Sequence, residues 1–380
     1  MASLQNQLFV QSEYEPPAWL SPAVSAAALP ATKVELGRFP TPYHRWRVSE
    51  EDSQGLEMWI KRDDLSSFDC GGNKVRKLQF LLAKALRSGA DTVVTIGGTQ
   101  SNHCRATAVA TRQLGLQPHL ILRTRGDVID PPSVFNKSLV GNLLFDKLVG
   151  SKISTVTQDE YNEVGSDELV RRQVNQLNAA GKKAFGIPVG GSNEVGVFGY
   201  IDCVFEIQQQ GIEFDHLVFS CGSGGTAAGL SIGAKLAGFP SVHGVGVCDS
   251  PDEFYDHITS VAAALGIDQE EYGTPRDWLQ LYDGQGDGYA LSKPEELGFI
   301  HRVSTTTGVL LDPVYSGKGL YYFLHDIVKR HPQTFKPGQK VLFIHTGGAL
   351  GLYDKSVEMA EILSKSTPDQ ISAMKIDEGL

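Results

Sequence analysis

The sequence has no apolar run long enough to span a bilayer and no long run of basic residues. Its formal net charge is −10, whereas a protein whose main partner is nucleic acid gathers positive charge against the phosphates. We therefore expect neither a nucleic-acid-binding protein nor a membrane protein. With 41% hydrophobic and 21% charged residues, the 380-residue chain has the composition of a soluble protein. It is long enough for two domains or one large α/β domain.

Cysteines are few and show no metal-binding spacing. The chain has five, an odd number, and no C-x-x-C motif. They are Cys70, Cys104, Cys203, Cys221 and Cys248. Reduced thiols in a cytosolic setting are the simplest interpretation, and no zinc or other metal site is expected.

The beginning of the sequence carries no clear targeting signal. The first thirty residues contain Glu13 and Glu15 but no arginine, so they resemble neither a secretory signal nor a strong transit peptide. We expect residues 1–35 to be an extension that wraps the surface. We expect the protein to be cytoplasmic, and the sequence leaves import into an organelle open.

Short apolar runs alternate with amphipathic stretches, which is typical of strand–turn–helix units. The run at 92–96, for example, predicts a buried strand of the parallel type. The expected fold class is α/β, built from parallel sheets without internal repeats. Strands are expected at 58–64, 92–96, 119–122, 152–157, 184–189, 216–220, 242–247 and 340–345. Helices are expected at 74–87, through 106–114, and at 141–148, 169–180, 199–210, 227–236, 254–265, 293–304 and 319–329, with a loop at 126–138.

A lysine that follows a glycine pair is the first candidate for chemistry. Gly71 and Gly72 allow a tight turn, and Asn73 is expected to cap the helix that follows. Lys74 then sits at the helix entrance, where the N-terminal dipole lowers the pKa of an amine. Such a lysine suits a Schiff base. On local sequence alone, a solvated surface lysine beside Arg76 is the commoner interpretation.

A glycine-rich turn between a predicted strand and a predicted helix is the second candidate. It is formed by Gly222, Ser223, Gly224, Gly225 and Thr226. Glycines expose backbone N–H groups, and the helix N-terminus adds positive potential, so the turn can cradle a phosphate. It lacks the lysine of a Walker loop and the spacing of a dinucleotide fold, which indicates a phosphate that anchors and does not react. A turn without any ligand is the alternative.

A candidate Schiff-base lysine together with a phosphate cradle predicts pyridoxal phosphate as the cofactor, which also needs groups for its ring oxygen and nitrogen. Asn102 follows a buried strand and could donate to the ring oxygen, although an ordinary helix cap is equally consistent. Ser101 and the adjacent N–H groups form another helix N-terminus, which suits a substrate carboxylate. His103 and Cys104 are expected to support this turn.

Five segments form a set that is highly specific in combination: GGNKVRKL at 71–78, QSNH at 100–103, IPVGGS at 187–192, DPVYSGK at 312–318 and FIHTGG at 343–348. From about Leu36 to Tyr353, the sequence resembles the D-cysteine desulfhydrase and 1-aminocyclopropane-1-carboxylate deaminase family. The resemblance implies a fold-type-II pyridoxal phosphate enzyme, similar to the tryptophan synthase β subunit, with two three-layer α/β domains of mostly parallel sheets. It implies a large domain at 36–76 and 189–364 and a small domain at 77–188. From the sequence itself we expect a mobile tail at 365–380.

The resemblance also implies roles for the candidate residues. Lys74 would carry the cofactor, Asn102 would contact its ring oxygen, and the glycine-rich turn would hold its phosphate. The residues implied at the substrate are Ser101, Tyr289 and Tyr315. Tyr289 lies in a less similar segment, so a core aromatic is a competing interpretation for it. A homodimer and a small amino-acid substrate are implied as partners.

Two positions distinguish the branches of this family. Where the deaminases have glutamate after the Asp-Pro-Val-Tyr run, this chain has Ser316, and where they have leucine before the Gly-Gly turn, it has Thr346. Both choices resemble the desulfhydrase branch. We expect both hydroxyls beside the pyridine nitrogen, where they bring no charge. The alternative is that they only satisfy nearby backbone groups.

The resemblance therefore implies a carbon–sulfur lyase that performs β-elimination on D-cysteine and yields hydrogen sulfide, pyruvate and ammonia. A thiol pKa of about 8.5 makes thiolate a fair leaving group. The first alternative is a 1-aminocyclopropane-1-carboxylate deaminase, which gives 2-oxobutanoate and ammonia and is disfavoured by Ser316 and Thr346. The second is a pyridoxal phosphate-binding protein without turnover. The preference for the D enantiomer rests on the resemblance alone.

Overall fold

The computed structural model describes residues 9–124 and 139–366. The loop predicted at 126–138 and residues 367–380 of the predicted tail lie outside the described residues. Within the described ranges, no helix is both long and apolar enough to cross a membrane.

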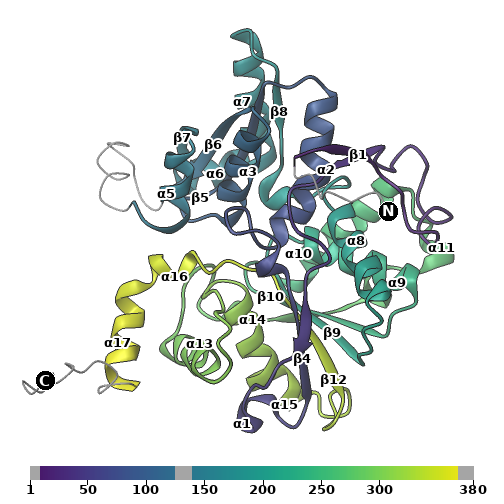
Figure 1. Ribbon diagram of the computed structural model, residues 1–380, viewed down its shortest axis with the longest axis vertical. Helices are drawn as coiled ribbons and strands as arrows, with labels where there is room; N and C mark the ends of the chain where they lie inside the picture. Colours follow the sequence, from purple (N-terminus) through teal and green to yellow (C-terminus); the bar gives the residue numbers. More distant parts are fainter. Residues whose placement is uncertain (1–8, 125–138, 367–380) are drawn as a thin grey trace, which may run out of the picture.

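Two separate sheets organise the chain, and they lie one above the other in Figure 1. The larger sheet has six strands in the order β11 (Gln280–Asp283), β10 (Ser241–Gly246), β9 (His216–Cys221), β12 (Lys340–His345), β4 (Glu57–Arg62) and β3 (Tyr43–Arg45). The smaller sheet has four, in the order β7 (Lys152–Val156), β6 (Gln117–Arg123), β5 (Thr92–Gly98) and β8 (Ala184–Gly186). All neighbours in these two sheets are parallel except the antiparallel edge pair β3–β4.

The larger sheet is covered by helices on both faces, because its strands are apolar on both sides. On β9, Leu217 and Phe219 belong to the core cluster that includes α8 (Phe198–Gln209), α9 (Gly225–Ala237) and α10 (Pro251–Leu265). Val218, between them, belongs to the opposite cluster with α13 (Pro294–Thr307) and α14 (Ser316–Tyr322). Alternate residues of a strand face opposite sides, so this pattern gives three layers.

The smaller sheet is likewise packed by helices. They are α2 (Asn73–Arg87), α3 (Asn102–Gln113), α5 (Gly141–Leu148), α6 (Gln158–Val164) and α7 (Ser166–Ala179). The fold is therefore the predicted α/β class with mostly parallel sheets. All four strands of the smaller sheet fall within 77–188 and all six of the larger sheet fall outside it. On that basis we propose 77–188 as the small domain and 36–76 with 189–364 as the large one.

Several predicted boundaries are wrong. Asn73 is not the helix cap, because α2 already includes it and the cap position is Gly72, whose φ is 103°. The strand expected to reach residue 189 ends at Gly186, and a 3₁₀ turn covers Val189–Gly191. The last large helix begins three residues earlier than predicted, at Ser316. The extension contributes a short antiparallel pair, β1 (Gln11–Glu13) and β2 (Thr32–Val34), and the final helix α17 (Ser356–Ser366) reaches into the predicted tail.

Candidate active site

A cavity of about 550 Å³ lies where the two sheets face each other. Its lining residues come largely from the carboxyl ends of parallel strands, β5 and β6 in the smaller sheet and β9, β10 and β12 in the larger. Ligands bind at such ends in open α/β sheets. Nine of the predicted site residues line this cavity: Lys74, Ser101, Asn102, Gly222, Ser223, Thr226, Tyr289, Tyr315 and Thr346.

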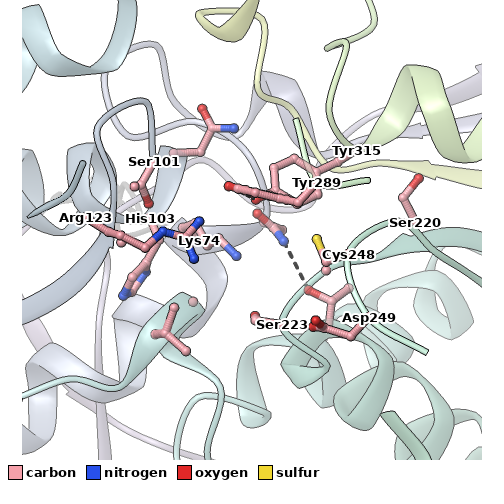
Figure 2. Close-up of a pocket in the computed structure, with 18 of the residues that line it drawn as sticks. Lys74, Ser101, His103, Arg123, Ser220, Ser223, Cys248, Asp249, Tyr289 and Tyr315 are labelled. Atoms are coloured by element: carbon pink, nitrogen blue, oxygen red, sulfur yellow. Dashed lines mark hydrogen bonds between the residues drawn. The ribbon is translucent and has the colours of Figure 1, made fainter. Parts of the chain in front are cut away.

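Lys74 is the second residue of α2, and its side chain lies in the cavity (Figure 2). Within the described part of the chain, no hydrogen bond or ion pair involves its amine. Burial lowers the pKa of Lys74 from its ordinary value to about 8. The sequence analysis expected a lowered pKa for another reason, the helix dipole, and the contribution of that dipole stays a prediction. An unpaired amine with this pKa is available for covalent bonding to an aldehyde.

The glycine-rich turn between β9 and α9 forms another wall of the cavity. Gly224 is the N-cap of α9 with a φ of 78°, and a Cβ there would lie 2.5 Å from Cδ2 of His257. Only glycine is compatible with both constraints. Ser223 and Thr226 line the cavity, whereas Gly224 and Gly225 form the start of the helix without lining it. The first N–H groups of a helix have no partner within it, so this turn can bind an anion.

A second helix start faces the same cavity from the smaller sheet. Ser101 is the N-cap of α3, and its hydroxyl accepts a hydrogen bond from the Cys104 N–H at 3.2 Å. Asn102 is the first helical residue, and its Oδ1 accepts from Nδ2 of Asn142 at 3.0 Å. His103 is buried with its Nε2 2.8 Å from Oγ1 of Thr95, and burial lowers its pKa, which is the supporting arrangement expected.

Two tyrosines lie side by side on the opposite wall (Figure 2). The hydroxyl oxygens of Tyr289 and Tyr315 are 3.0 Å apart, and their ring centroids are separated by 6.2 Å. Burial is the main cause that raises the pKa of both phenols, so both are neutral at pH 7. A Cβ at Gly222 would lie 2.7 Å from Cε1 of Tyr315, which shows how closely the tyrosine ring approaches the glycine-rich turn.

Of the two hydroxyls predicted beside the pyridine nitrogen, Thr346 lines the cavity and Ser316 does not. Ser316 is fully buried, and its Oγ donates to Oδ1 of Asp312 at 2.5 Å and accepts from the Asp312 N–H at 3.2 Å. The same carboxylate accepts hydrogen bonds from the N–H groups of Val314 and Tyr315. Ser316 thus has the local bonding expected if its hydroxyl only satisfies nearby groups of the chain. Its role toward the pyridine nitrogen stays a prediction.

Sequence reasoning missed Arg123, Cys248 and Asp249, which also line the cavity (Figure 2). The Arg123 guanidinium lies 4.9 Å from the ring centroid of Tyr161 and 5.8 Å from that of Tyr289. It has no hydrogen bond or ion pair within 9–124 and 139–366. A usable signal existed, because Arg123 ends one parallel strand and Cys248 closely follows another.

Lys77 was also missed as a candidate. It is fully buried one helical turn after Lys74, and its Nζ donates to the carbonyl of Gly190 at 3.2 Å. A Cβ at Gly225 would lie 2.9 Å from this Nζ, so a second lysine of α2 lies beside the start of α9. Burial, together with the charge of Lys74, lowers the pKa of Lys77 well below its ordinary value, so an anion bound at this helix start would favour the charged form of the lysine.

Comparison with known proteins agrees with this geometry. The model of the family described as pyridoxal-phosphate dependent enzyme matches residues 34–347. A mitochondrial protein of Arabidopsis thaliana, described as bifunctional D-cysteine desulfhydrase/1-aminocyclopropane-1-carboxylate deaminase, is 45% identical over 359 residues, which cover 92% of this chain and 86% of the relative. A D-cysteine desulfhydrase of Serratia proteamaculans is 36% identical over 311 residues, 80% of this chain and 89% of the relative.

A solved structure shows the same fold. The crystal structure of an ACC deaminase homologue superposes with a TM-score of 0.75 at 32% sequence identity, covering 91% of this chain and 98% of the homologue. Because the match spans nearly the whole of both chains, it includes the two sheets and the cavity between them.

Proposed function

The chain belongs to the family of pyridoxal-phosphate dependent enzymes, and we propose that it is a D-cysteine desulfhydrase, a lyase that releases hydrogen sulfide, pyruvate and ammonia. One observation carries the proposal: the amine of Lys74, which has no partner among the described residues, converges on a single cavity with the start of α9 and the start of α3. An aldehyde cofactor with a phosphate, together with an amino acid, requires an amine and two anion sites.

The residues present fit pyridoxal phosphate. Lys74, with a pKa lowered to about 8, would hold its aldehyde carbon, and the start of α9 with Ser223 and Thr226 would hold its phosphate. The Nζ of Lys77 would lie beside that phosphate, whose negative charge would favour the ammonium form against the burial that lowers its pKa. When bound, the cofactor supplies an electron sink that stabilises negative charge at the substrate Cα. Asn102 is proposed to donate to the ring oxygen, and Thr346 to lie near the ring nitrogen.

The substrate would be oriented by the other side of the cavity. The start of α3 with Ser101 is suited to the carboxylate, because its free N–H groups and dipole favour an anion. The amine of Lys74 is proposed to move the proton at Cα of the substrate. The hydrogen bond between the neutral phenols of Tyr289 and Tyr315 uses one of their two hydroxyl hydrogens, so the pair has one hydrogen left to donate near the reacting atoms.

The leaving group would depart next to Arg123. A thiolate is a stable anion near neutral pH, since a thiol has a pKa of about 8.5. The Arg123 guanidinium lines the cavity and has no hydrogen-bond acceptor among the residues that the structure describes, so it can stabilise that anion without a proton transfer.

We also propose a cytoplasmic homodimer, which is the assembly implied by the family resemblance. A second activity deserves testing alongside the first, because the 45% identical Arabidopsis relative is described as bifunctional. Ring opening of 1-aminocyclopropane-1-carboxylate would give 2-oxobutanoate and ammonia from the same cavity.

The test is a product assay on the purified protein loaded with cofactor. D-cysteine, L-cysteine and 1-aminocyclopropane-1-carboxylate are supplied separately, and sulfide, pyruvate and 2-oxobutanoate are measured. We expect equal amounts of sulfide and pyruvate from D-cysteine, with L-cysteine turned over about 10²-fold more slowly. Faster 2-oxobutanoate formation would make the protein primarily a deaminase. Bound cofactor without any oxo acid product would mean a binding protein without turnover.

A further inference from the structure

Lys318 has no role in the reaction proposed above, yet its ammonium group is the most heavily hydrogen-bonded of the lysines near the cavity. It is the third residue of α14, and its side chain is completely buried. The Nζ donates to the backbone carbonyls of Gln285 at 2.9 Å, Gly288 at 2.9 Å and Leu291 at 2.6 Å. These three bonds use all three hydrogens of the ammonium. The buried carboxylate of Glu296 lies 3.9 Å away and balances the charge.

The carbonyls come from one irregular segment, residues 285–291, which wraps around the ammonium. Three of its residues have positive φ: Gly286 at 59°, Gly288 at 117° and Ala290 at 58°. Ala290 is not a glycine, so its left-handed backbone is sparsely populated and persists only where surrounding contacts impose it. Converging carbonyl dipoles repel one another unless a cation sits between them. The shape of this segment therefore depends on the positive charge of Lys318.

The same segment carries Tyr289 to the wall of the cavity. Its phenol oxygen lies 3.0 Å from that of Tyr315, and Tyr315 is the N-cap residue of α14. One tyrosine is therefore attached to α14 through the backbone and the other through the Lys318 ammonium. The positions of Tyr289 and Tyr315 are therefore both set by α14.

We propose that Lys318 is a positioning residue that acts as a built-in monovalent cation: its ammonium folds 285–291 around itself and so sets Tyr289 against Tyr315. A cage of backbone carbonyls at these distances is also the coordination that K⁺ accepts. Removal of the side chain leaves the three carbonyls and the Glu296 carboxylate around an empty space. K⁺ or NH₄⁺ can occupy that space, so the variant should become dependent on these ions, whereas the natural protein is not.

The main experiment uses Lys318→Ala in the enzyme loaded with cofactor. In buffer with choline as the cation, we expect kcat for D-cysteine to fall about 10²-fold, the effect of misplacing a reacting group by about 1 Å. K⁺ or NH₄⁺ should restore most of it and raise the thermal midpoint, and Li⁺ at equal ionic strength should not. Lys318→Met fills the space with an apolar chain and should stay impaired in every salt. Lys293→Ala removes a half-buried lysine that pairs with Asp287 of the same segment and should show no selective response.

A second measurement separates positioning from general structural support. If Lys318 acts through Tyr289, Lys318→Ala should reduce kcat much less in a Tyr289→Phe background than in the natural one, because coupled residues are not additive. Equal reductions in both backgrounds would overturn the proposal, and so would equal rescue by Li⁺ and K⁺ or no rescue at all. Should Lys318→Ala fail to fold in choline, refolding in K⁺ but not Li⁺ supports the proposal, and failure in both contradicts it.

The inference rests on the proposed reaction only through the choice of assay. The thermal midpoint of Lys318→Ala in K⁺ and Li⁺ is measured without substrate. If the protein is inactive on D-cysteine but the variant still shows the K⁺-selective shift, the proposed reaction is refuted and the proposed role of Lys318 stands. If the protein is active but the variant shows no shift, the proposed role of Lys318 is refuted and the reaction stands.

Discussion

Two buried lysines at the starts of two helices, Lys74 and Lys318, have opposite surroundings. Burial lowers the pKa of both. Lys74 faces an open cavity, and no described residue forms a hydrogen bond or ion pair with its amine. Lys318 has three carbonyl partners, and Glu296 opposes the fall of its pKa.

The difference shows how surroundings divide one side chain between chemistry and structure. An ammonium with three acceptors is stabilised in its charged form and cannot easily give up a proton. When a buried amine has no acceptor, no hydrogen bond offsets the cost of desolvating its charged form. The neutral amine is therefore available as a nucleophile and a base near pH 8. Lys74 is thus suited to react, whereas Lys318 is suited to hold the structure of the cavity wall.

The largest expected effect comes from removing the reactive member of the pair. Lys74→Ala should lower pyruvate formation from D-cysteine by about 10⁴-fold, because both the covalent anchor and the proposed base are lost. The fold should persist, as measured by circular dichroism, since no hydrogen bond of Lys74 is lost within the described ranges. Lys318→Ala provides the contrast, because K⁺ should restore the turnover of this variant and should not restore that of Lys74→Ala. Near-normal turnover in Lys74→Ala would refute the assignment.

Tyr315→Phe should lower kcat by about 10²-fold while the cofactor stays bound. The substitution removes a hydroxyl that bonds Tyr289 and keeps the ring that packs close to Gly222. Cofactor content by absorbance and turnover per bound cofactor are the two measurements. Loss of cofactor with normal turnover per remaining cofactor would place Tyr315 at the phosphate and contradict the proposed arrangement.

The lowered pKa of Lys74 predicts the pH dependence of cofactor binding by the apoprotein. The rate of recombination should rise about tenfold per pH unit below about pH 8, where the amine is half neutral, and level off above it. N-acetyl-lysine, with an ordinary pKa, should show no plateau at this pH. The unfolded chain binds more protons than the apoprotein between about pH 8 and 10.5, so this group makes unfolding less favourable as pH rises through that window. A plateau only above pH 10 would mean an ordinary lysine.

The smallest expected effects concern Thr346 and Ser316, of which only Thr346 lines the cavity. Thr346→Leu should lower the ratio of D-cysteine to 1-aminocyclopropane-1-carboxylate turnover several-fold, because it removes a hydroxyl beside the proposed ring nitrogen. Ser316→Ala should change the thermal midpoint more than this ratio, since its hydroxyl bonds Asp312. If the double variant Ser316→Glu/Thr346→Leu keeps the natural preference while folded and loaded, neither position decides the chemistry.

Local patterns in the sequence predicted most of the fold and nine of the residues that line the cavity. Strand and helix positions followed from apolar periodicity, and Lys74 and the glycine-rich turn followed from residue types whose behaviour is local. Helix ends were less accurate, as at Asn73, because a cap depends on one backbone angle that sequence patterns constrain weakly. Arg123 was missed because its meaning arises only when two strands end at the same cavity.

The sequence by itself determined the chemistry that each residue can perform: an amine at Lys74, exposed N–H groups at Gly222 to Thr226, and hydroxyls at Tyr289 and Tyr315. Tertiary structure alone decided which of these act together. Residues more than 200 positions apart meet because parallel strands of two sheets end at one crevice. It also decided that Lys74 has no acceptor within 9–124 and 139–366 and that Lys318 has three, since burial and backbone direction at a point are properties of the whole packed chain.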